Sequence, residues 1–288
     1  MKHALVLGGS GQIGVPLLQR LYHAGWRVTG ISRHEQHDRP GLHWLQGDLS
    51  SMPALPARVD AIFSCGPLLK FAKWYEQSGI EASRVVAFGS TSAETKRGSA
   101  DADERRVAQE LREGEAALFA AAVPRNDAVT VLRPTLIYGA GRDATLTRIA
   151  QLARRLRYFP LPRGANGLRQ PVHVDDLADA AFGVLDVPAT FGQVYAVPGG
   201  EVLSYRDMVA RTLACLRPPV RLIELPSPLF NLALLAAQAT GRASGLGEAA
   251  VRRMRGDMTF DAGPAQRDFG YEPRAFRPSA EMFEPPRE

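Results

Sequence analysis

Cysteine is scarce in this chain, with only Cys65 and Cys215 among 288 residues. Two cysteines cannot build a disulfide framework, and their separation matches no metal-ligand spacing. The sequence therefore predicts no disulfide cross-links, no metal site and a reducing compartment. The chain also starts almost directly with the strand-like ALVLGG, without a charged and apolar leader, so we expect a cytoplasmic protein.

Long apolar runs and long runs of like charge are also absent. The most apolar later stretch is PSPLFNLALLAAQATGR (226–242), and its unbroken part falls short of the ~20 residues that cross a bilayer. The formal net charge is +5, but the basic residues are nearly all arginines interleaved with acids. We therefore expect a core or lid helix rather than a membrane span, and no nucleic-acid partner.

What the chain does contain is a regular alternation of strand and helix patterns. After the N-terminal strand, short segments rich in β-branched or aromatic residues lie at 26–33, 42–49, 59–66, 84–92 and 129–139. Helical patterns separate them, which predicts the α/β class with a doubly wound parallel sheet of Rossmann type. Such a sheet binds ligands beyond the carboxyl ends of its strands.

A glycine-rich turn, GGSGQIG at 8–14, joins the first strand to the first helical pattern. Its glycines allow a tight turn and the close approach of a pyrophosphate, whose charge the free N–H groups of the following helix can meet. Pro16 is compatible with a first helical turn, where its missing N–H has no partner to lose. The turn predicts dinucleotide binding by Gly8, Gly9, Ser10, Gly11, Gln12, Ile13 and Gly14.

The end of the second predicted strand indicates which dinucleotide binds. An NAD site usually presents Asp or Glu about 20 residues beyond the glycines, whereas arginine there accommodates a 2′-phosphate. This chain has Ser32 and Arg33 at that point. We therefore expect NADP(H) as the cofactor.

Several segments together resemble one family. They are GGSGQIG, the GDL at 47–49, LRPTLIYGAGRD at 132–143, PVHVDDLADAA at 171–181 and VYAVPGGEVLSYRDMV at 194–209. In this order they are similar to the extended short-chain dehydrogenase/reductase superfamily of the NAD-dependent epimerase/dehydratase type. The closing MTFDAGPAQRDFGYEPRAF (258–276) resembles the C-terminal lobe of proteobacterial members.

The resemblance implies roles for individual residues. Asp48 and Leu49 would flank the adenine, and Cys65 and Gly66 would pass their backbone along the cofactor. Near the nicotinamide and its pocket the resemblance places Ser90, Arg133, Pro134 and Tyr138, with Thr91 as the assisting hydroxyl and Ser92 beside it, while His173 would be structural. We expect a Rossmann domain at 1–140 and 171–198, interleaved with a smaller substrate-binding lobe at 141–170 and 199–288.

One departure from the family pattern concerns the Tyr-x-x-x-Lys pair, in which lysine lowers the pKa of the tyrosine that exchanges a proton with substrate. No tyrosine occurs between Tyr75 and Tyr138, and no lysine follows Lys96. Aligning Glu115 with the acid that follows the motif puts Val107 and Leu111 at the two positions. At helical spacing, the residues predicted to form a packed stripe are Val107, Leu111, Gly114, Leu118 and Ala121.

Three functions remain open. The first is an atypical NADPH-dependent reductase of a small carbonyl or enone substrate, with protonation from Tyr138, a strand-five hydroxyl or water. The alternative for Tyr138 is a packing residue of its turn. The second is a non-catalytic NADP(H) sensor or scaffold, and the third is a sugar-nucleotide epimerase or dehydratase. The substrate is a small molecule, and it would be apolar if the 229–239 helix lines its cleft. Near that helix Arg252, Arg253 and Arg255 form a cationic cluster, and an oligomer is compatible with the sequence.

Overall fold

The structure is a computed structural model, and it describes residues 1–239 and 252–285. Residues 240–242 of the predicted apolar stretch lie outside this range. The chain divides into two compact units. The first comprises 1–135, 174–198 and 261–273, and the second comprises 136–173, 199–260 and 274–288.

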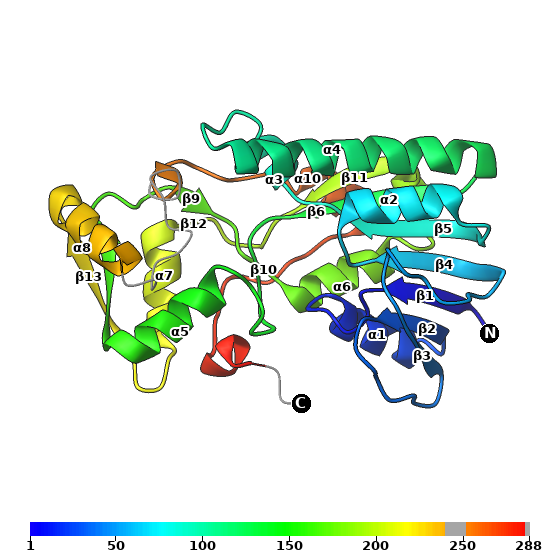
Figure 1. Cartoon of the computed structure of the whole chain (residues 1–288), viewed down its shortest axis with the longest axis horizontal. Coiled ribbons are helices and arrows are strands. Elements are labelled where there is room, and N and C mark those ends of the chain that lie inside the picture. The colour runs from blue at the N-terminus through cyan, green and yellow to red at the C-terminus, as the bar shows by residue number, and fades with distance from the viewer. Residues whose placement is uncertain (240–251, 286–288) are drawn as a thin grey trace. The chain divides into compact units, whose positions relative to one another are not determined.

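A parallel sheet forms the centre of the first unit (Figure 1). Within the described residues it has seven strands in the order β11-β6-β5-β4-β1-β2-β3. These are β1 (His3–Leu7), β2 (Arg27–Ser32), β3 (Leu42–Gln46), β4 (Arg58–Ser64), β5 (Glu81–Phe88), β6 (Ala128–Pro134) and β11 (Gln193–Val197). All neighbouring pairs are parallel, so the predicted Rossmann-type sheet is confirmed.

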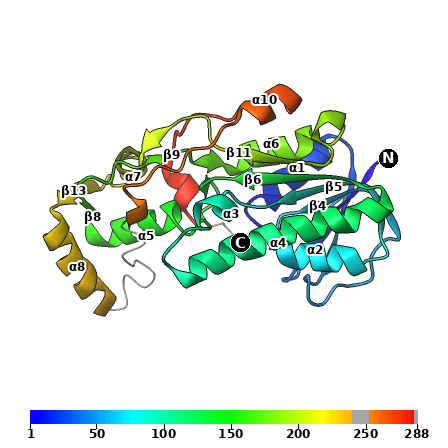
Figure 2. The same ribbon diagram turned by 90° about the horizontal axis from the view of Figure 1, so that it is seen from above.

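Helices cover both faces of this sheet. On one face α1 (Gly14–His23) contacts α6 (Val174–Gly183), and on the other α2 (Leu68–Gln77) lies along α4 (Ala102–Ala122), as Figure 2 shows from above. The remaining helical elements of this unit are α3 (Ser92–Thr95), η1 (Val123–Arg125), η2 (Pro188–Thr190) and α10 (Gly263–Phe269). Apolar side chains of the strands, including Leu5, Ile62 and Val85, pack against Phe71 of α2 and Leu118 of α4 in one core cluster.

The segment 261–273 packs with the first unit, whereas the sequence predicted it in the smaller lobe. Two buried tyrosines account for this placement. The Tyr195 hydroxyl on β11 donates to Asp268 over 2.6 Å, and the Tyr271 hydroxyl donates to the carbonyl of Pro198 over 2.7 Å. These contacts join positions about 73 residues apart, which local sequence patterns do not reveal.

The second unit has its own core. Its helices are α5 (Leu146–Leu156), α7 (Tyr205–Ala214), α8 (Ser227–Ala239) and η3 (Ala280–Phe283), and its paired strands are β7 (Ile137–Tyr138) with β10 (Val172–His173), β8 (Tyr158–Pro162) with β13 (Arg221–Leu225), and β9 (Leu168–Arg169) with β12 (Leu203–Ser204). The core includes Tyr138, Leu146, Met208, Phe276 and Phe283. None of the helices described in the two units combines the length and apolar character that a membrane span needs.

Two predicted local features differ from the structure. Tyr138 lies on β7 of the second unit rather than at the end of the sixth strand, because β6 ends at Pro134. The predicted stripe on α4 is also only partly buried, since Val107 is 38% exposed. The helix instead packs most closely at Gly114, where a Cβ atom would approach the Leu69 backbone nitrogen of α2 to 2.7 Å.

A buried arginine ties the amino ends of the strands to the chain that follows α6. Arg84 on β5 is 5% exposed. Its guanidinium donates to the carbonyls of Ala128, Val184 and Leu185 and to the hydroxyls of Thr130 and Thr190 over 2.7–3.2 Å. Burial lowers its pKa to about 10, so the group stays charged near neutral pH.

Replacing this side chain should destabilise the fold. We expect Arg84→Met to lower the free energy of unfolding by about 3 kcal/mol, because several buried acceptors lose their donor together. Urea denaturation followed by circular dichroism measures the change. Arg58→Met, at an exposed position of β4, is the control and should change stability by less than about 0.5 kcal/mol. Equal effects of the two substitutions would contradict the role assigned to Arg84.

Candidate functional site

The glycine turn between β1 and α1 is built by backbone packing. Gly8 has φ +76°, and its carbonyl accepts a hydrogen bond from the Gly11 amide over 2.9 Å. A Cβ atom at Gly14 would approach the Gly8 oxygen to 2.3 Å and the Gly9 Cα to 2.6 Å. The start of α1 therefore lies directly on the turn, as a phosphate-binding turn requires.

The loops after the neighbouring strands meet this turn. The Ser10 and Ser32 hydroxyls lie 3.0 Å apart, which joins the turn to the end of β2. A Cβ atom at Gly8 would lie 3.3 Å from the carbonyl carbon of Cys65, after β4. The structure thus brings together the predicted cofactor residues that follow β1, β2 and β4.

The loop after β3 lies beside the loop after β4. A Cβ atom at Gly66 would be 3.8 Å from Leu49 Cδ1, so the residues after β3 and β4 are neighbours. The Asp48 carboxylate accepts from the amides of Ser50 and Ser51 over 2.7 and 2.9 Å. These bonds hold the pKa of Asp48 below its usual value and keep the carboxylate ionised.

The end of β2 carries a hydroxyl and a cation. Ser32 is 4% exposed, and its Oγ accepts from the His34 amide over 3.2 Å. Arg33 is exposed, and its guanidinium has no acidic partner within hydrogen-bond distance among residues 1–239 and 252–285. The charge of Arg33 also contributes to the lowered pKa of Asp48. This arrangement can take an anionic group.

Two polar groups near the turn, the Cys65 thiol and the Gln12 side-chain oxygen, are withdrawn from solvent. Burial raises the pKa of the Cys65 thiol to about 12, so this thiol is protonated at neutral pH and is not a nucleophile. Gln12 Oε1, within the turn, is buried and has no hydrogen-bond partner in the part of the chain that the structure describes. An unpaired buried carbonyl oxygen is costly, which makes a donor on a bound molecule favourable there.

Sequence reasoning missed Trp44 on β3. A Cβ atom at Gly30 would lie 2.6 Å from the Trp44 indole, and one at Gly9 would lie 3.0 Å from the far edge of the same ring. The indole therefore packs across β2 and supports the second glycine of the turn. A glycine inside the β2 pattern was the available signal, since glycine in a strand often marks such a close approach.

An ion pair connects α4 to the end of β6. The Arg133 guanidinium donates to both carboxylate oxygens of Glu115, 2.7 Å from Oε1, and to Glu94 on α3 over 2.6 Å. Glu115 is 6% exposed, and its hydrogen bonds raise the pKa of Arg133 further. The ion pair with Glu115 occupies the guanidinium of Arg133, which the sequence predicted to bind the cofactor.

The hydroxyl residues that follow β5 lie beside the end of β6. Thr91 Oγ1 and the Thr91 amide both contact the carbonyl of Pro134, each over 3.1 Å. Ser90 Oγ accepts from the Ser92 amide over 3.1 Å, and Ser92 begins α3. These three residues thus form a turn at the carboxyl edge of the sheet. Helix α4, beyond it, contains neither tyrosine nor lysine.

Tyr138 and His173 pack together within the second unit. Tyr138 is 1% exposed, and its ring meets His173 and Phe276 edge to face with centroids 5.1 and 4.9 Å apart. A Cβ atom at Gly139 would lie 2.4 Å from His173 Nε2. These contacts favour a packing role for Tyr138.

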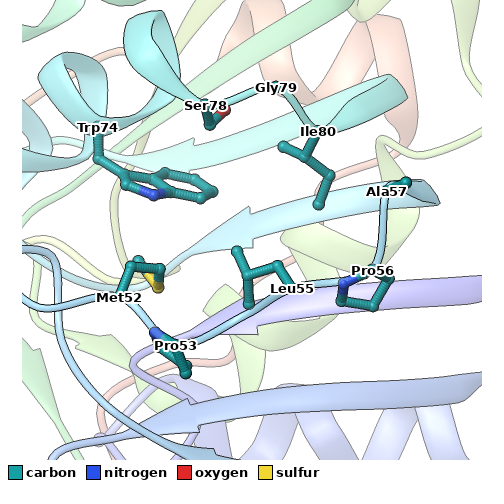
Figure 3. A pocket seen from close by; sticks show the side chains of 9 residues that line it. All are labelled: Met52, Pro53, Leu55, Pro56, Ala57, Trp74, Ser78, Gly79 and Ile80. Carbon is teal, nitrogen blue, oxygen red and sulfur yellow. The ribbon is translucent and has the colours of Figure 1, made fainter.

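A shallow pocket of about 290 Å³ lies away from these loops (Figure 3). Its lining includes Leu55, Trp74 and Ile80, whose side chains face the opening in Figure 3. Ala57 and Ile80, which also line it, directly precede β4 and β5, so the pocket is near the amino ends of those strands. The glycine turn follows the carboxyl end of β1, and the pocket is therefore not part of the dinucleotide site.

Comparison with known proteins agrees with this geometry. Residues 4–89, which include the glycine turn and the loops after β2, β3 and β4, match the model of the NAD dependent epimerase/dehydratase family. The fold matches the epimerase Mth375 of Methanothermobacter thermautotrophicus with a TM-score of 0.72 at 14% identity, covering 98% of this chain and 90% of that one. Residues 4–89 are thus similar to the NAD dependent epimerase/dehydratase family, and the chain shares its fold with this solved epimerase.

Two further proteins are similar to this chain over most of its length. The 2-alkyl-3-oxoalkanoate reductase of Stenotrophomonas maltophilia is 26% identical over 313 residues, which cover 94% of each chain. The enzyme WbmF of Bordetella bronchiseptica, in complex with NAD+ and UDP, matches with a TM-score of 0.69 at 17% identity over 98% of this chain and 90% of that one.

The glycine turn can be tested by one substitution. We expect Gly11→Val to abolish dinucleotide binding, because its side chain projects from a turn whose backbone must approach the pyrophosphate. The fold should largely persist, since a Cβ atom there meets only the Gly8 carbonyl oxygen closely, at 3.0 Å. Calorimetric titration with NADPH and NADH measures the loss. Gly98→Val, at an open loop position, is the control; wild-type binding by Gly11→Val would refute the assignment.

Proposed function

We propose that this protein binds NADP(H) and reduces a small carbonyl substrate. The observation that carries the cofactor proposal is the end of β2, where Ser32 hydrogen-bonds to the glycine turn and Arg33 has no acidic partner among the described residues. A carboxylate at this point would repel a 2′-phosphate, whereas arginine can bind it through charge-assisted hydrogen bonds.

The residues that would hold the cofactor are those of the carboxyl edge. The amides at the start of α1 would bind the pyrophosphate, and the backbone of Cys65 and Gly66 would continue the path. Asp48 and Leu49 would border the adenine. When bound, NADPH supplies a hydride to the carbonyl carbon of the substrate. The protein's own part is to orient that carbonyl and to deliver a proton to its oxygen.

Similarity to a reductase supports reduction over the other two functions. The 2-alkyl-3-oxoalkanoate reductase is similar over 94% of both chains, and its name describes reduction of a ketone. Epimerases and dehydratases start by removing a proton from a sugar hydroxyl, and α4 lacks the tyrosine and lysine that serve as base in such relatives. The second candidate is a protein that binds the cofactor without catalysing a reaction. Cofactor binding needs only the loops at the carboxyl edge of the sheet.

For the proton we propose the hydroxyl residues after β5. Ser90, Thr91 and Ser92 follow the carboxyl end of that strand. Thr91 Oγ1 donates its one proton to the Pro134 carbonyl, so Thr91 is fixed in place and supports the turn that presents Ser92. Ser92 is half-buried at the start of α3 and would deliver the proton directly or through water. A neutral hydroxyl is a poor base, which favours the reductive direction.

Cofactor preference tests the first part of this proposal. We expect NADPH to bind at least about tenfold more tightly than NADH, since a charge-assisted contact contributes about 1.5–3 kcal/mol and tenfold corresponds to ~1.4 kcal/mol. Arg33→Ala should remove the preference without weakening NADH binding. Calorimetry of both cofactors measures it, with exposed Arg39→Ala as the control. Equal wild-type affinities would contradict the NADP(H) assignment.

Substitution of the hydroxyl groups tests the second part. With the best substrate of a panel of aldehydes, ketones and 3-oxo acids, we expect Ser92→Ala to lower the rate of NADPH oxidation ~10²-fold with NADPH affinity preserved. Tyr138→Phe should keep the rate within about threefold, because its ring packs on His173 and Phe276. A ~10²-fold loss in Tyr138→Phe would instead make Tyr138 the general acid. Tight NADPH binding without any turnover would favour the binding module.

A further inference from the structure

The two units of the chain carry charge of opposite sign. The second unit has 18 arginines, no lysine and 9 acidic residues, so its formal net charge is +9. The first unit has 17 basic and 21 acidic residues, so its formal net charge is −4. The value of +5 for the whole chain therefore conceals one strongly basic unit. Such an excess of arginine attracts anionic partners.

A two-stranded ribbon of this basic unit exposes apolar and cationic side chains together. Strands β8 and β13 pair in parallel, and Phe159 and Leu161 of β8 lie in the core of the unit. The alternate side chains face outward, since Tyr158 is 52% and Ile223 is 42% exposed. Arg221 is exposed, pairs in register with Tyr158, and has no acidic partner among the described residues.

Helix α8 lies beside β8 and adds further exposed apolar side chains (Figure 2). Leu229, Leu232 and Leu235 are 56%, 66% and 63% exposed. Their three-residue spacing places them along one side of the helix, which the buried Phe230 anchors. Single exposed leucines are ordinary, but neighbouring ones along one helix face indicate a binding surface.

Further exposed arginines lie at the ends of these elements. Arg155 and Arg157 precede β8, and Arg163 follows it. The guanidinium of Arg255 donates to the hydroxyl of Ser227, the first residue of α8, over 2.8 Å. Within residues 1–239 and 252–285 these four arginines have no acidic partner at ion-pair distance. Their charge is therefore available to a partner outside the chain.

We propose that the outer face of the β8–β13 ribbon, the three leucines of α8 and these arginines bind the surface of an anionic lipid bilayer. We call them the basic-apolar surface. Phosphate headgroups would pair with the arginines, and the leucines, Ile223 and Tyr158 would enter the boundary between headgroups and acyl chains. A tyrosine suits this boundary because its ring is apolar and its hydroxyl is polar.

The charge and the apolar side chains together select this partner. Nucleic acid supplies phosphates, but its backbone supplies no hydrocarbon in which exposed leucines would be buried. A second copy of the chain could cover the leucines, but it would bring arginines against arginines. A bilayer surface offers anionic groups and hydrocarbon side by side. The proposal does not depend on the proposed function, because it concerns the second unit alone.

Vesicle co-sedimentation with the full chain tests the proposal. We expect binding to phosphatidylcholine vesicles that contain about 30% phosphatidylglycerol, and at least about tenfold weaker binding to pure phosphatidylcholine. Raising the salt concentration from about 0.1 M to about 0.5 M should weaken binding about tenfold, because salt screens the charge attraction. Leu232→Glu and Arg221→Glu should each weaken it at least about tenfold.

Two matched controls change the total charge by the same amounts. Val202→Glu alters an exposed apolar residue of the same unit, and Arg39→Glu alters an exposed arginine of the first unit. Both should bind anionic vesicles within about twofold of wild type. Circular dichroism checks the fold of each variant. Where a glutamate variant does not fold, Leu232→Ser and Arg221→Gln should weaken binding about threefold.

Several results would overturn the proposal. These are no binding to anionic vesicles, equal binding to neutral ones, or equal weakening by the controls and the surface variants. Binding of a DNA duplex that Arg221→Glu abolishes and Leu232→Glu preserves, without vesicle binding, would make nucleic acid the partner. A dimer in size-exclusion chromatography that Leu232→Glu dissociates would make a second copy the occupant of the leucine face.

Discussion

The carboxyl edge of the sheet depends on the contact between the start of α1 and the turn before it. Gly14 lies so close to Gly8 and Gly9 that no side chain fits between them. This contact sets the direction in which α1 leaves the turn. It also fixes the position of α1, whose Arg20 pairs with Asp179 of α6 over 2.7 Å. A backbone arrangement of three glycines thus positions both the proposed pyrophosphate site and the helix layer on one face.

A second constraint acts on the other face. The Arg133–Glu115 pair fixes α4 against the end of β6, and the packing of Gly114 on α2 holds the same part of the helix. The two motif positions lie one and two turns earlier, where Val107 is partly exposed. Helix α4 carries neither a tyrosine nor a lysine. In the proposed reaction at this edge the proton would therefore come from other groups, and the hydroxyl residues after β5 are the ones proposed to supply it.

Local patterns predicted most of the central sheet because each strand is short, apolar and followed by a turn residue. The same patterns joined β6 and β7 into one strand, since VTVLRPTLIYG is mostly β-branched or apolar and the break after Pro134 depends on which unit each half packs against. They also placed 261–273 in the wrong unit. The hydrogen bonds of Tyr195 and Tyr271 that hold this segment come from partners far away along the chain. The role of Trp44 was not predicted for a related reason. Its ring lies over Gly30 only because β3 pairs with β2.

The sequence by itself determined the class of fold, the family resemblance and the glycine turn, because these follow from spacing within short segments. It also determined that Asp and Glu are missing where the second strand ends and that α4 has no tyrosine or lysine. Only the tertiary structure decided which of these residues are neighbours: that Ser10 meets Ser32, that Glu115 pairs with Arg133, and that Tyr138 is buried against Phe276. Contacts between distant segments depend on how strands pair and helices pack, and chain order alone does not specify that packing.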